Sequence, residues 1–336
     1  MTNATKTLAL IFAGTLTLAL AASWSGSTTS SAAFEEELLA VDTSAVQAVR
    51  IEEPPGTPVR LERTGDGWAV APSDTSVTYP ASPQSVDQLF STLPSLQVGA
   101  VATRQPDKHP RYGVDSTGTT VTLLGGNDEQ LGQLIVGRTR MRRPQGGGQR
   151  QNPMQRRRRP GTPVTYVRSP DRPDVYSVEQ SLRALTSRSV EDWRDKQIWA
   201  LDRSQIQQID FRYPADSSFT VRRAPQSDTT AAPDKWVSAG DTLSRSSTSS
   251  LLRTLSTAEA DGFVNDQSPS DLGNAAYTID VQLSDGTQRA LHIRRTPEKG
   301  QHYVATADGY PYVVKLRKSN WDRSVLMGRS ALLENP

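Results

Sequence analysis

Aliphatic and polar residues alternate along several short stretches of this chain, and these stretches recur in two sets. The first set opens with "VQAVRIEE" (46–53) and "PVRLERTGDGWAVA" (58–71). The second opens with "IQQIDFRY" (206–213) and "FTVRRAPQSDTTAAPDKWVSAG" (219–240). A period of two is typical of strands with one buried face. Both sets therefore predict a hairpin that ends on a tryptophan, Trp68 or Trp236, which we expect to plug the core or the sheet edge, with stacking on a ligand as the weaker alternative.

An amphipathic helix follows the hairpin in each set. In the first, Ser82 is a predicted N-cap and Pro83 the first helical residue. The apolar positions of this helix fall at helical spacing: Val86, Leu89, Phe90 and Leu93. In the second set, "SSTSSLLRTLSTAEA" (246–260) places three leucines on one face: Leu251, Leu252 and Leu255.

Two further hairpins complete each set. The first of these pairs is 111–138 and 271–295, where Asp285-Gly286 is a strong turn signal. The next pair, 164–182 and 302–321, leads into a helix. The links are too short for parallel crossovers. We therefore expect an α+β protein of two tandem related repeats, 40–201 and 202–336, built of mostly antiparallel β-hairpins with packed helices.

The first 24 residues predict a membrane segment. An uncharged, mostly apolar stretch runs from residue 7 to 24 between Lys6 and the next basic residue, Arg50. It is either an uncleaved transmembrane anchor or a signal cleaved near Ala19–Ala21, and a buried core helix is the weaker alternative. Residues 25–39 are then a polar linker. The positive-inside rule places the body outside the cytoplasm, as a single-pass protein or, if cleaved, a secreted one.

Charge is concentrated in one segment of the chain. Nine arginines and no acidic residue lie between Arg138 and Arg159, while the rest of the chain holds 29 basic and 36 acidic side chains. We predict that 138–162 is a disordered insertion in a hairpin. Its polyanion-contact candidates are Arg156, Arg157, Arg158 and Arg159. The segment is interpreted as a passive solvated loop or a contact for an anionic envelope polymer. Nucleic acid is disfavoured because the segment has no aromatic residue.

Motifs for chemistry are absent from the sequence. The chain has no cysteine, which excludes disulfides, thiol nucleophiles, cysteine-bound metal and a lipoprotein anchor. His109, His292 and His302 lack metal-ligand spacing. Glu191 and Asp195 would share a helix face beside Trp193, but Arg194 and Lys196 next to them favour a solvated charged helix over an acid–base pair. Alternatively, "WRDKQ" (193–197) packs at the junction and caps the first copy against the second. The same alternatives apply to Asp192. We predict no catalytic residue, cofactor or metal site.

Four short motifs, "GDGWAV", "RYGVD", "DVYSV" and "WRDKQI", together make the chain similar to a known family. Over residues 40–330 it resembles the bacterial domain-of-unknown-function family DUF4340. This resemblance implies a membrane-anchored extracytoplasmic protein, often encoded beside ABC-transporter components of the gliding-motility type, with no active site to carry over.

These observations predict a non-enzymatic accessory or scaffold protein of an ABC-type transport or gliding-motility assembly. Two alternatives remain: an enzyme acting on envelope glycans through dispersed carboxylates, and a cell-surface polyanion-binding protein.

Overall fold

The computed structural model describes residues 38, 39, 41–65, 67–73, 77–142, 161–214, 217–225, 235–294 and 300–334. The predicted membrane segment, most of the polar linker and the tetra-arginine run at 156–159 lie outside these residues. Within the described parts, no helix is both long and apolar enough to cross a membrane.

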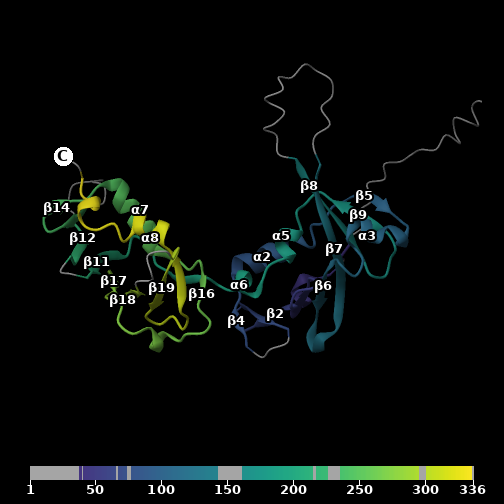
Figure 1. The fold of residues 1–336 in the computed structure, drawn as a ribbon, viewed down its shortest axis with the longest axis horizontal. Coiled ribbons are helices and arrows are strands. Elements are labelled where there is room, and N and C mark those ends of the chain that lie inside the picture. The colour runs from purple at the N-terminus through teal and green to yellow at the C-terminus, as the bar shows by residue number, and fades with distance from the viewer. Residues whose placement is uncertain are drawn as a thin grey trace, which may run out of the picture. The chain divides into compact units, whose positions relative to one another are not determined.

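The first half of the chain folds into a nine-stranded antiparallel sheet (Figure 1). Its strands in chain order are β1 (Ala48–Glu52), β2 (Val59–Thr64), β3 (Gly67–Pro72), β4 (Tyr79–Pro80), β5 (Val98–Thr103), β6 (Thr119–Leu124), β7 (Gln130–Arg142), β8 (Thr162–Arg168) and β9 (Val175–Val178). In space the order is β4-β3-β2-β1-β6-β7-β8-β9-β5.

The second half folds into another nine-stranded antiparallel sheet, drawn in green to yellow in Figure 1. Its strands are β11 (Ile206–Arg212), β12 (Phe219–Arg223), β13 (Trp236–Ser238), β14 (Asp241–Thr242), β16 (Gly262–Phe263), β17 (Tyr277–Leu283), β18 (Gln288–Arg294), β19 (His302–Ala307) and β20 (Val314–Arg317). The spatial order is β14-β13-β12-β11-β17-β18-β19-β20-β16. Strand for strand, this is the order of the first sheet.

The strands of the predicted hairpins form, whereas β4, β5, β14 and β16 were not predicted. Along β11, Ile209 and Phe211 are buried while Gln208 and Asp210 stay partly exposed, and a register shift between Ile206 and Gln208 brings Ile206 into the same core. The β17–β18 hairpin closes at Asp285-Gly286, where Gly286 takes φ +85°, a conformation that L side chains rarely adopt. The prediction of an α+β fold with mostly antiparallel sheets is confirmed.

Short helices connect the strands. They are α2 (Pro83–Thr92), α3 (His109–Tyr112), α5 (Arg183–Thr186), α6 (Val190–Trp193), α7 (Arg245–Ser256) and α8 (Lys318–Ser324). As predicted, α2 begins at Pro83, and the Ser82 hydroxyl accepts a hydrogen bond of 3.3 Å from the Ser85 amide. The three leucines of α7 are buried in the second core, and α7 lies beside α8 (Figure 1).

The arginine-rich insertion starts later than the sequence indicated. Residues 138–142 were expected to be disordered, but they continue β7, and Arg142 pairs in register with Thr162 of β8. Two contacts hold the arginines of this extension: Arg142 bonds to Glu179, and the Arg140 guanidinium lies 6.0 Å from the Tyr166 ring centroid. The amino-acid composition of this segment predicted disorder, because composition contains no information on β8, the strand that pairs with it across the hairpin.

By contacts the chain divides into two compact units. The first unit holds Met1–Arg63, Ala71–Ser76 and Asp87–Ser187, and the second holds Thr64–Val70, Val77–Val86 and Arg188–Pro336. Within the second unit, β10 (Gln197–Ala200) pairs with β15 (Thr257–Glu259) and supplies Ile198 and Trp199 to the core. The boundaries 24/25, 39/40 and 201/202 stay predictions.

Candidate functional site

The three carboxylates around Trp193 do not face a common site. Helix α6 ends at Trp193 because Arg194 takes an extended backbone (ψ 147°), so Asp195 does not share a helix face with Glu191 as the sequence predicted. Instead, Glu191 Oε1 accepts a hydrogen bond of 3.1 Å from the Phe263 amide in β16. Asp195 Oδ1 accepts one of 3.0 Å from the Gln197 amide. Each carboxylate is therefore bound to backbone.

Asp192 completes a capping box at the start of α6. Its carboxylate accepts hydrogen bonds from the Ser189 hydroxyl (2.7 Å) and the Ser189 amide (3.2 Å), while the Ser189 hydroxyl accepts one from the Asp192 amide. The Ser189 hydroxyl is the main reason that the pKa of Asp192 lies below its usual value. A carboxylate held in its charged form this way is a poor proton donor at neutral pH.

Arg194 is buried, whereas the sequence predicted a solvated charged helix. Its side chain is 3% exposed, and its guanidinium carbon lies 3.4 Å from the ring centroid of Phe263 and 3.8 Å from that of Tyr79. Tyr312 approaches at 4.9 Å, and Nη1 donates a hydrogen bond of 2.7 Å to Asn265 Oδ1. Burial lowers the pKa of this arginine. Trp193, next to it in the chain, is fully buried as well.

The three histidines belong to three different elements. His109 opens α3, and its Nε2 donates to the Pro173 carbonyl at 2.8 Å. His292 in β18 pairs with Asp308 at 3.1 Å, and His302 begins β19 as expected. In the part of the chain that the structure covers, no three histidine, aspartate or glutamate side chains gather into a potential metal site.

The two tryptophans predicted to plug the hairpins differ in burial. Trp68 in β3 is half-buried. Trp236 in β13 is 2% exposed and belongs to the core of the second unit. The Trp236 indole nitrogen is buried, and it has no hydrogen-bond partner among the described residues. A buried N–H in that state is uncommon in proteins, which draws attention to what surrounds it.

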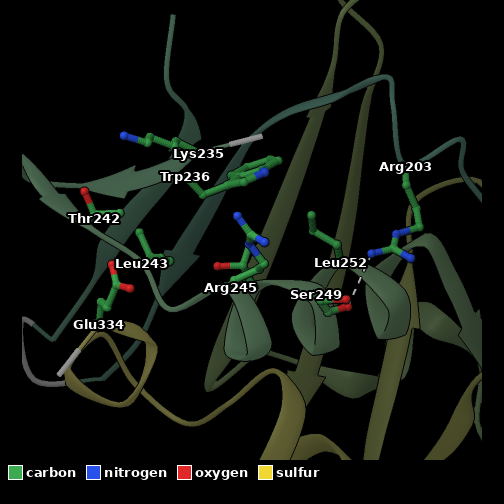
Figure 2. A pocket seen from close by; sticks show the side chains of 10 residues that line it. Arg203, Lys235, Trp236, Thr242, Leu243, Arg245, Ser249, Leu252 and Glu334 are labelled. Atoms are coloured by element: carbon green, nitrogen blue, oxygen red, sulfur yellow. Dashed lines mark hydrogen bonds between the residues drawn. The ribbon is translucent and has the colours of Figure 1, made fainter. Parts of the chain in front are cut away.

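Trp236 borders a pocket between the β13–β14 hairpin and the first turns of α7 (Figure 2). The cavity measures about 290 Å³. Its lining residues are Arg203, Lys235, Trp236, Thr242, Leu243, Arg245, Thr248, Ser249, Leu252 and Glu334. We call this the cation-lined pocket.

Three of the lining side chains are cations, and one is an acid. Arg203 comes from the loop before β11, Lys235 precedes β13, and Arg245 begins α7. Arg203 Nη2 lies 3.5 Å from the Ser249 carbonyl oxygen. The described residues place no carboxylate oxygen within 4.0 Å of any of the three cations. The pocket therefore has an excess of positive charge and of hydrogen-bond donors.

Sequence reasoning missed this pocket because its cations lie far apart in the chain. Arg203, Lys235 and Arg245 each resemble an ordinary solvated charge between polar neighbours. The one available signal was the start of α7, "RSSTSS", whose first turn has no acidic residue. The arginines that the sequence did nominate, Arg156 to Arg159, lie outside the described residues.

Other cavities of the second unit have a different character. One of about 470 Å³ is lined by both signs of charge, with Arg253 and Arg323 facing Glu259 and Asp261. Another, of about 780 Å³, is lined mainly by aromatic, small and apolar side chains. The cation-lined pocket alone among these three combines several cations with a buried unpartnered donor.

Comparison with known proteins supplies a family. A family model described as Domain of unknown function (DUF4340) matches residues 73–144 and 158–280. No curated protein and no solved structure matches the chain. The matched ranges cover well over half of the sequence and span strands of both sheets, so the chain belongs to the DUF4340 family.

Proposed function

We propose that this protein is a non-enzymatic accessory or scaffold protein of an ABC-type transport or gliding-motility assembly. Residues 7–24 anchor it in a bacterial cell membrane, and the two sheets, as tandem related repeats, lie outside the cytoplasm. Three features support the proposal: the apolar N-terminal stretch, the absence of basic residues between it and Arg50, and the membership in DUF4340.

The non-enzymatic part of the proposal rests on the hydrogen bonds of the three carboxylates around Trp193. Glu191, Asp192 and Asp195 each accept a hydrogen bond from a backbone amide of their own surroundings. General acid–base catalysis needs such groups free to exchange a proton with a substrate. Gly262 supports the same interpretation, because a β-carbon there would collide with Glu191 Oε1, so Glu191 is packed tightly against β16.

The competing function is an enzyme that acts on envelope glycans through dispersed carboxylates. It would need at least one of these acids to leave its backbone partner during turnover. A surface polyanion-binding protein is the other alternative, and the arginine run at 156–159 is the feature that favours it.

The test is recovery of partners from membranes. A full-length copy with a C-terminal affinity tag is expressed in its native host, solubilised in mild detergent and purified with whatever remains bound. We expect ABC-transporter or motility subunits to co-purify. N-terminal sequencing of the same sample should return an intact start, whereas a start near Ala22 would remove the anchor from the proposal.

The matched controls separate the three functions. The carboxamide variants Glu191→Gln, Asp192→Asn and Asp195→Asn should recover the same partners as the natural chain. Loss of a glycan-cleaving activity in one of them, with folding intact, would establish the enzyme instead. Loss of partners on replacing the four arginines 156–159 by glutamine would favour the polyanion binder.

A further inference from the structure

We propose that the cation-lined pocket binds the oxyanion group, phosphate or carboxylate, of a sugar-sized ligand. This inference goes beyond the accessory function, and it holds wherever the protein is located. Four properties of the pocket lead to it: its charge, its unpartnered donor, the helix that starts at its wall, and its size.

The pocket is positively charged, whereas the body of the chain is mildly acidic. Outside the arginine-rich segment the chain carries an excess of acidic residues. The pocket nevertheless brings together Arg203, Lys235 and Arg245 without an ion-pair partner in the described chain. All three side chains are exposed to solvent. Cations that line one cleft repel one another, and the cleft focuses their field. An anion bound between them relieves that repulsion.

The donor is the indole N–H of Trp236. It is buried at the wall of the pocket and has no acceptor among the described residues. In Figure 2 the Trp236 ring lies above Arg245 and Leu252, which rise from the helix below. A buried N–H without an acceptor is destabilising, so a site of this kind is completed by an oxygen atom from elsewhere. A ligand oxyanion supplies such an oxygen after the side chains that now cover the nitrogen move aside, because the nitrogen itself has almost no exposed surface.

Helix α7 adds a third attraction for an anion. It runs for 12 residues from Arg245, and its first turn contains no acidic side chain. The N-cap residue Ser244 gives the helix no side-chain hydrogen bond, because its hydroxyl lies 2.9 Å from the Ser246 hydroxyl instead. The first amides of a helix carry a partial positive charge and bind phosphate and carboxylate groups.

The size and lining of the pocket indicate more than a bare ion. A cavity of about 290 Å³ lies at the lower end of the range for small-molecule sites. Leu243, Leu252 and the Trp236 ring provide apolar surface, while three hydroxyl side chains, Thr242, Thr248 and Ser249, can hydrogen-bond to a sugar. Figure 2 shows Lys235 and Arg203 on opposite sides of this space. The ligand class is therefore a sugar phosphate or an acidic sugar.

The experiment measures binding to the full-length chain in detergent by isothermal titration calorimetry. Glucose 6-phosphate and glucuronate are the two anionic probes, and glucose is the neutral control. We expect at least one anionic probe to bind, with affinity that falls as salt is raised, and glucose to give no measurable heat. The preferred anion identifies whether the natural ligand carries a phosphate or a carboxylate.

Variants then locate the site. Arg245→Gln should weaken binding about tenfold, the usual effect of losing a hydrogen bond to a charged group. Trp236→Phe keeps an aromatic side chain but removes the N–H together with the five-membered ring, and it should also weaken binding. Arg253→Gln lies on the same helix α7 but outside this pocket, and it should leave the affinity unchanged. Circular dichroism checks that each variant is folded.

A second readout follows the indole directly. With ¹⁵N-labelled tryptophan, the Nε1–H resonance that is lost in Trp236→Phe should shift when the anionic probe is added. Three results would overturn the proposal: no binding of either anionic probe, equal binding of glucose, or unchanged affinity in Arg245→Gln together with an unshifted Trp236 resonance. None of these depends on whether transporter subunits co-purify.

Discussion

At the scale of single residues, Arg194 shows how the fold changes the meaning of a sequence. Between Trp193 and Asp195 it resembles a solvated charge, yet it is buried against three aromatic rings. Its partners Tyr79, Phe263 and Tyr312 come from distant parts of the chain. A planar guanidinium can stack on aromatic faces and still hydrogen-bond at its edge, as Arg194 does to Asn265.

Replacement of Arg194 should therefore destabilise the second unit. We expect Arg194→Ala to lower the free energy of unfolding by about 3 kcal/mol, because it removes cation–π contacts, a hydrogen bond and packed volume together. Arg194→Lys should recover only part of this loss, since an ammonium group does not stack. Urea unfolding followed by tryptophan fluorescence measures both. Arg253→Ala is the control for a partly solvated arginine, and an equal effect in it would show that the aromatic contacts contribute nothing.

At the scale of elements, the long β7–β8 hairpin is tied to the segment that follows β9. Thr165 in β8 is fully buried, and its hydroxyl donates to the Gln180 carbonyl at 2.6 Å. The same oxygen accepts from the Leu182 amide at 3.3 Å and lies 2.8 Å from the Thr139 hydroxyl. One side chain thus links both strands of the hairpin to the start of α5.

Substitution of Thr165 by valine tests this link. Valine has almost the same shape but leaves a buried carbonyl, a buried amide and a hydroxyl without their partner, so we expect a loss of about 2 kcal/mol in stability. Thr120→Val in the neighbouring strand β6 is the matched control, because Thr120 has no side-chain hydrogen bond in the described structure, and it should stay within about 0.5 kcal/mol of the natural chain. Equal thermal stability of the two variants would contradict the argument.

At the scale of the whole molecule, the two sheets repeat one strand order, and the second unit begins before its first sheet strand. Residues from Arg188 onward group with it, and β10 contributes Ile198 and Trp199 to its core. The Trp199 indole also donates a hydrogen bond of 2.6 Å to the Leu255 carbonyl at the end of α7. A fragment cut at 201/202 would lose these contacts.

Two fragments compare these boundaries. We expect 188–336 to unfold at a higher temperature than 202–336, because burial of a tryptophan and an isoleucine contributes on the order of 3 kcal/mol or more. Differential scanning calorimetry measures the two midpoints. The unfolding midpoint of a third fragment, 188–336 with Trp199→Ala, should be lower and close to that of 202–336. If 202–336 and 188–336 unfolded at the same temperature, β10 would contribute nothing to the stability of the second unit.

The pattern along the chain predicted the strands of the main hairpins, the two longest helices and the repeated order of elements, but not the short strands such as β15, which follows α7 where the helix was expected to continue. Each of these depends on local periodicity, such as the alternation along β11, or on local turn and cap chemistry, such as Gly286 and Ser82. Such signals lie within a few residues of one another, so they can be read along the chain.

Which charged residues are buried and which are paired depends on the fold and could not be predicted from the chain. Arg194 is enclosed by rings that are distant in sequence, and β7 extends through Arg142 because β8 lies opposite. The cation-lined pocket joins a loop, a hairpin and a helix start. Electrostatic environment and hydrogen-bond satisfaction depend on distances in space, and no pattern along this chain records those distances.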